Sequence, residues 1–127
     1  MPVINDLLLY IGSIIIIFWG IAHIVPTKAI VSGFGAISED NKLIITMESI
    51  TEGLTLCFIG MLVLLVTSLA GSQSQAAHIV YLACAVMLLI MAILTAMTGA
   101  RTSILPYKIC PGVKTIVAIL FFLGSLL

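Results

Sequence analysis

The chain has 127 residues, of which 62% are hydrophobic and only 8% are charged. Soluble domains carry roughly 45–50% apolar and about 25% charged residues, so this composition excludes an ordinary soluble domain. Five Lys and Arg residues balance five Asp and Glu residues. Without a net basic charge the chain has no field to hold nucleic acid, which excludes that class of partner. The length fits a single domain, residues 1–127.

The first apolar segment, residues 7–25, contains no charged residue. As a helix it would be about 28 Å long, close to the ~30 Å thickness of the bilayer core. No small-residue cleavage site stands before Pro26, so we expect this segment to be retained as a membrane span and not removed as a signal peptide.

Three further spans follow from the remaining apolar stretches. A long charge-free region is divided by polar and turn-forming residues at 71–76, which predicts two helices there. A last helix is predicted to begin at Pro111, a residue suited to a first helical turn. The predicted spans are residues 7–25, 43–69, 77–98 and 111–127. Because these segments lack the period-two alternation of a barrel, we expect an all-α, integral membrane four-helix bundle.

All five basic residues fall in or beside two of the predicted loops: Lys28, Lys42, Arg101, Lys108 and Lys114. The opposite side, with both termini and the turn at 71–76, has none. Basic loops favour the cytoplasm, so we expect a cell-membrane protein with both termini outside the cytoplasm.

Small residues recur at helical spacing within the spans, which is typical of helix contacts in lipid. They predict packing faces at Gly12 and Gly20, at Gly53 and Gly60, and at Ala92 and Ala96.

The first basic loop has Ile30, Phe34 and Ile37 at the spacing of a short amphipathic helix, although Gly33 and Gly35 make a re-entrant loop an equal alternative.

The most informative residues are Glu48 and Glu52, which share one helix face. Glu52 is predicted to lie about one turn inside the membrane, where a carboxylate facing lipid costs up to ~2.5–3.5 kcal/mol and normally finds a partner. His23 is expected at a similar depth on the neighbouring span. These residues predict a polar site, although Glu48 could be a solvated first-turn carboxylate and His23 a packing residue.

Two basic side chains, Arg101 and Lys114, are expected at the same end of the bundle, where they could supply countercharge to the site. Their alternative role is that of interface anchors. Trp19, one turn before His23, could add a hydrogen-bond donor or an aromatic wall. The candidate ligand-binding residues are therefore His23, Glu48, Glu52, Arg101, Lys114 and Trp19.

Neither a metal site nor a catalytic site is expected from the sequence. His23, Glu48 and Glu52 supply three ligands at most, and their spacing is not the Glu-x-x-His pattern of bundle metal sites. The three cysteines, Cys57, Cys84 and Cys110, are scattered singly, which argues against a disulfide framework or a zinc site. No Ser or Cys stands in a nucleophile motif, so the sequence does not support nucleophilic catalysis; it leans away from an enzyme without deciding the question.

Three motifs carry a resemblance: Trp19-Gly20-x-x-His23-x-x-Pro26, Gly33-Phe34-Gly35 and Glu48-x-x-x-Glu52-Gly53. With them the chain resembles small uncharacterised four-span bacterial membrane proteins and, more distantly, the DoxX-like group. That resemblance implies a four-helix membrane fold and, for some members, an association with quinone-linked oxidoreductases. It implies no catalytic residue. Small multidrug transporters are similar in size, but their key Glu lies in the first span, where this chain has only His23.

These observations favour a membrane protein that binds a lipid-like or quinone-like molecule at the cytoplasmic end of the bundle. The alternatives are a proton-coupled small transporter subunit, with Glu52 as the protonatable group, and a structural subunit of a membrane complex. Expected partners are membrane lipid, the lipid-like or quinone-like ligand and a second copy of the chain; the sequence leaves the cofactor unknown.

Overall fold

A computed structural model describes residues 2–127, and that part of the chain is helical and contains no strand. The elements are α1 (Pro2–Ile24), α2 (Thr27–Ser32), α3 (Glu39–Leu65), the π-helix η1 (Val66–Ala70), α4 (Gln75–Met97), the 3-10 helix η2 (Gly99–Arg101) and α5 (Leu105–Leu126). Four of these helices are long and apolar enough to cross a membrane. The predicted all-α, four-helix membrane fold is confirmed.

The start of the last helix differs from the prediction. Helix α5 begins at Leu105, so Pro111 lies inside it, and Pro106 takes the place near the helix start that Pro111 was expected to have. Proline is tolerated inside membrane helices, although Pro111 has no N–H to donate to the carbonyl four residues before it. The Pro111 carbonyl itself accepts from the Thr115 hydroxyl at 2.7 Å. Cys110, which was expected in a loop, therefore lies within the helix, one turn before Lys114.

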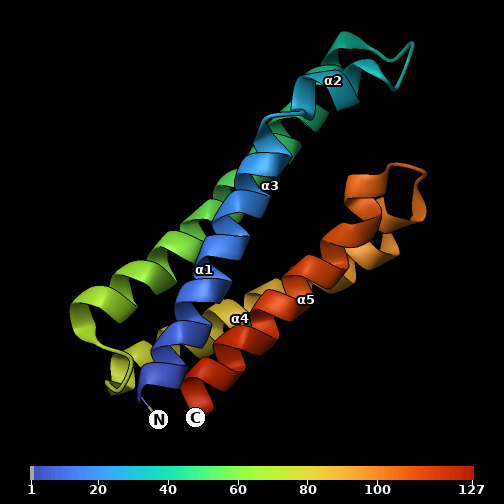
Figure 1. Cartoon of the computed structure of the whole chain (residues 1–127). Helices are drawn as coiled ribbons and strands as arrows, with labels where there is room; N and C mark the ends of the chain where they lie inside the picture. Colours follow the sequence, from blue (N-terminus) through green and yellow to red (C-terminus); the bar gives the residue numbers. More distant parts are fainter. Residues whose placement is uncertain (1) are drawn as a thin grey trace.

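The long helices form two antiparallel pairs, α1 with α3 and α4 with α5, and α1 also packs against α5. Figure 1 shows that the pairs meet near the two chain termini and diverge toward α2 and η2. Helices α3 and α4 have little contact with each other. The bundle is therefore closed at the end that holds the termini, which we call the closed end, and open at the end of the basic loops, which we call the open end.

Glycines bring α1 and α3 into backbone contact. A Cβ atom added to Gly20 would lie 2.6 Å from the Gly53 carbonyl oxygen, and one added to Gly60 would lie 2.8 Å from the Ser13 carbonyl oxygen. Both distances are far below normal van der Waals contact, so no side chain larger than hydrogen fits. Gly12 contacts Phe121 of α5 in a similar way. The packing faces predicted for the first two spans are confirmed.

On α4 only part of the predicted small face is buried. Ala92 is 5% exposed, whereas Ala96 is exposed to the surroundings of the protein. Large apolar side chains are exposed on all four long helices, among them Phe18, Phe58, Ile90 and Ile116. Such a surface is suited to contact with lipid, as expected for a multi-pass membrane protein.

The first basic loop is helical over a shorter stretch than predicted. Helix α2 ends at Ser32, before Phe34, and it buries Thr27 and Val31. The chain then turns through Gly35, whose φ of 77° is a conformation that favours glycine. The predicted apolar stripe of the loop is thus interrupted where the glycines stand.

Polar contacts join the helices at the closed end. The Thr67 and Tyr81 hydroxyls lie 2.7 Å apart, linking the π-helix η1 to α4, and the Ser72 hydroxyl donates to the Asp6 carboxylate. The Nδ1 atom of His78 is 3.0 Å from the Ser125 hydroxyl oxygen. These contacts hold together the end of the bundle that lies opposite the candidate site.

Candidate functional site

Lys114 forms the centre of the site. Its side chain is fully buried, and its ammonium group donates to the Glu52 carboxylate and, at 2.9 Å, to the Thr95 hydroxyl. Lys114 and its two partners come from three helices, α5, α3 and α4. A buried ammonium ion needs a counterion and further acceptors, and Glu52 and Thr95 supply both. The two charges balance, so the cluster adds no net charge to the membrane interior.

His23 lies on the other side of the same carboxylate and is 7% exposed. Its Nδ1 atom is 3.7 Å from Glu52 Oε2, and its Nε2 atom is 3.2 Å from Cys110 Sγ. The Thr27 hydroxyl donates to the His23 carbonyl at 2.7 Å and closes the C-terminal end of α1. The imidazole is therefore placed between a carboxylate of α3 and a thiol of α5.

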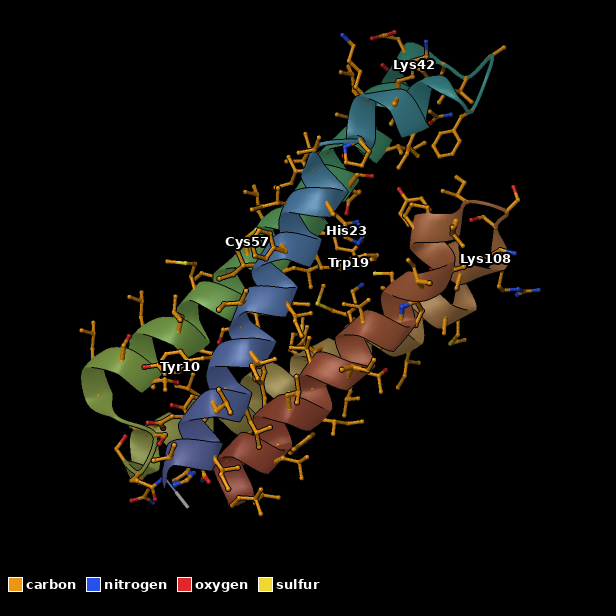
Figure 2. The ribbon with its side chains drawn as sticks, in the orientation of Figure 1. Tyr10, Trp19, His23, Lys42, Cys57 and Lys108 are labelled. Atoms are coloured by element: carbon orange, nitrogen blue, oxygen red, sulfur yellow. The ribbon has the colours of Figure 1, made fainter. Side chains whose placement is uncertain are left out.

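Trp19 and Tyr107 enclose this group of residues. The Trp19 indole N–H donates to Cys110 Sγ at 3.2 Å, and its ring meets the imidazole edge to face with centroids 5.9 Å apart. Tyr107 lies on the other side, with its ring centroid 6.1 Å from that of His23. Figure 2 shows Trp19 and His23 on the side of α1 that faces α5. The two aromatic rings thus both border the imidazole.

A groove of about 340 Å³ lies between α3 and α4, where the two helix pairs diverge. Its α3 wall is polar and includes Glu48, Ser49, Thr51, Glu52 and Thr55. The opposite wall consists of Met87, Met91, Leu94 and Thr95 of α4, of Thr98 and Gly99 just beyond its end, and of Tyr107 from α5. Along α4 the lining changes from hydroxyls near the open end to thioethers deeper in the bundle. The groove is thus polar at its mouth and apolar further in.

A second, smaller cavity of about 180 Å³ lies on the opposite side of the site, between α1, α2 and α5. Trp19, His23 and Tyr107 line it together with Ile30 and Pro106. The site is therefore approached from both sides at the open end of the bundle.

The structure brings four of the six predicted residues together: Trp19, His23, Glu52 and Lys114. Glu48 lines the groove but is exposed, which agrees with its position one turn nearer the loop. Arg101 is exposed on η2 and makes no ion pair within residues 2–127, so it does not supply the countercharge. The alternative role predicted for Lys114 was that of an interface anchor. Lys114 is instead buried, and it supplies the positive charge that pairs with Glu52.

Sequence reasoning missed Cys110 and Thr95. Cys110 would have joined the site if the last helix had been started at Pro106, because it stands four residues before Lys114 and shares its helix face. Thr95 stands in an apolar run with no neighbouring polar residue, so the sequence held no signal for it. His23, Glu52 and Cys110 now place donor atoms within 4.8 Å of one another, a combination that the sequence-based expectation of no metal did not consider.

Comparison of the chain with protein-family models, with curated proteins and with solved structures gives no match. The resemblance to DoxX-like proteins stays a prediction, and the function is argued below from the site alone.

Proposed function

We propose that this protein binds a lipid-like or quinone-like amphiphile in the groove between α3 and α4. The observation that carries the proposal is the change in the groove's lining, from Glu52, Thr95 and Thr98 near the open end to Met87 and Met91 deeper in. A polar head could bond the carboxylate and hydroxyls, while an apolar chain lay along the thioethers, whose flexibility suits irregular ligands.

The state of Glu52 supports a binding role. Its side chain is 27% exposed and lines the groove, while one of its oxygens accepts from Lys114. The ion pair fixes the carboxylate in place, so a ligand would meet an oriented acceptor that needs no rearrangement. Lys114 and His23 thus act as positioning residues behind Glu52, an acidic group that a ligand can reach from the groove.

We further propose that the groove opens toward the cytoplasm. The open end carries all five basic residues of the chain, and the positive-inside rule supports a cytoplasmic location for it. A ligand of the inner leaflet could then enter laterally between α3 and α4, which have little contact with each other.

Lipid extraction and mass spectrometry of the gently purified protein test the proposal. We expect a co-purifying lipid or quinone, and we expect Met87→Trp to lose it because the indole fills the groove. Ile90→Trp is the matched control: Ile90 is also exposed on α4 but does not line the groove, so this variant should keep the ligand.

Equal retention by both variants, or no ligand in the unchanged protein, would contradict the proposal. In the same preparation, a ligand-free homodimer would favour a proton-coupled transporter subunit, and a stoichiometric second polypeptide would favour a structural subunit of a membrane complex.

A further inference from the structure

We propose that His23 and Cys110, oriented by Glu52 and Trp19, form a binding site for a monovalent soft metal ion, Cu(I). This site is distinct from the amphiphile groove, although both include Glu52. The donor atoms of His23, Glu52 and Cys110 lie within 4.8 Å of one another. His23 and Cys110 are buried, at the point where three helices converge.

The two ring nitrogens of His23 have different neighbours, and this arrangement is suited to metal binding. Nδ1 faces the Glu52 carboxylate at 3.7 Å, and Nε2 faces Cys110 Sγ at 3.2 Å. Metal-bound imidazoles usually direct their second nitrogen at a carboxylate or carbonyl, which fixes the tautomer and the ring orientation. Glu52 would orient the ring in this way and leave Nε2 free to bind the ion beside the sulfur.

The chemistry of the donors favours a soft ion. Thiolates select Cu(I) and zinc among the common metals, and imidazole suits both. The Trp19 indole N–H, 3.2 Å from Cys110 Sγ, would stabilise the thiolate that metal binding creates. The ion replaces the thiol proton: Cys110–SH and Cu(I) give Cys110–S–Cu and a proton, which is released to water.

The charge of the cluster distinguishes Cu(I) from zinc. Lys114 and Glu52 already neutralise each other, so one cation and one thiolate leave the cluster neutral when the cation is monovalent. A divalent ion would leave a net charge of about +1 in a buried membrane site, where uncompensated charge is expensive. The buried ammonium group of Lys114 thus selects against Zn²⁺ and favours Cu(I).

An anaerobic titration of the purified protein with Cu(I), in competition with a chromophoric Cu(I) chelator, tests the proposal. We expect one tightly bound Cu(I) per chain. Cys110→Ser should weaken binding by at least about 100-fold, and Trp19→Phe, which removes only the indole donor, by roughly 10-fold. Cys84→Ser is the control for thiol content and should bind Cu(I) like the parent. Met87→Trp should also leave copper binding unchanged, which separates this site from the amphiphile groove.

Equal copper binding by Cys110→Ser and the parent would overturn the site, and tighter binding of Zn²⁺ than of Cu(I) would overturn the choice of ion. X-ray absorption at the copper edge gives a measurement on the unchanged chain, whatever the folding of the variants. One sulfur and one or two nitrogen or oxygen neighbours are expected. A shell of sulfur atoms alone would place the ion on methionines and contradict the proposal.

Discussion

Lys114 of α5 is fully buried and donates to the carboxylate of Glu52 of α3, although the two helices belong to different helix pairs. Both residues lie near the middle of their helices, and the two helix pairs diverge toward the basic loops (Figure 1). A buried pair of this kind contributes little net stability when it is intact, but it is costly to break because one charge is left without a partner. The effects of changing either residue should therefore be unequal.

Glu52→Gln is expected to lower the free energy of unfolding by about 3–5 kcal/mol, since it leaves the fully buried Lys114 ammonium without a counterion. Lys114→Met should cost less, because Glu52 is partly exposed and retains His23 at 3.7 Å. The double variant with Glu52→Leu and Lys114→Met should recover most of the loss.

Equilibrium unfolding in detergent, arranged as a double-mutant cycle, measures these differences. Glu48→Gln is the control and should unfold like the parent, because Glu48 is exposed. A Glu52→Gln variant as stable as the parent would show that the ion pair does not hold a buried charge.

Gly53→Ala should destabilise the protein by roughly 1–3 kcal/mol through overpacking of the contact between α1 and α3. The new methyl group would lie 2.7 Å from the Gly20 carbonyl oxygen and 2.5 Å from Ile24 Cγ1. Gly112→Ala is the matched control: nothing lies within 4 Å of its added Cβ, so this helical position should gain up to ~1 kcal/mol. Thermal unfolding of both variants and the parent measures these effects. If Gly53→Ala unfolded at the same temperature as the parent, the two helices would be further apart than described.

Ala92→Leu and Ala96→Leu make the same change one helical turn apart and should differ in outcome. Ala92 is 5% exposed, so a larger side chain there should cost roughly 1–3 kcal/mol. Ala96 is exposed and should tolerate leucine. The midpoints of thermal unfolding in detergent, compared between the two variants, check which face of α4 is buried. If Ala96→Leu unfolded at a lower temperature than Ala92→Leu, the face with Ala96 would be the one against the core.

A reporter that is active only outside the cytoplasm should be active when fused after Leu127. All five basic residues lie at the open end, while both termini lie at the closed end. A fusion truncated after Gly35, in the first basic loop, is the control and should be inactive. The opposite pattern would turn the groove and its polar site toward the exterior.

The sequence was sufficient to predict the four long helices and the partnership of Glu52, because both follow from the cost of polar groups in lipid. It also indicated His23 and Trp19, which share a helix face one turn apart. It could not show that Lys114 would be buried, since a basic residue near a span end is more often an anchor.

The wrong start of the last helix had the largest consequence for the site. Two prolines compete for the first turn of α5, and the sequence-based prediction chose Pro111 because proline suits a first helical turn. Pro106 is the one near the helix start, and this choice moves Cys110 onto the face that meets His23. The divergence of α3 from α4 depends on tertiary packing, so the groove could not be predicted from the sequence.

The backbone contact between Gly20 and Gly53 also constrains motion. Because no side chain separates α1 from α3 at this point, the two helices cannot slide past each other without a clash. We therefore expect them to move as one rigid unit. The second helix pair, α4 with α5, contacts the first pair at the closed end, where Leu9 packs against Gly124 and Phe121 against Gly12. If the proposed ligand enters the groove, we expect the angle between the two helix pairs to change. The contacts at the closed end would act as the hinge, and the Glu52–Lys114 ion pair would oppose the opening.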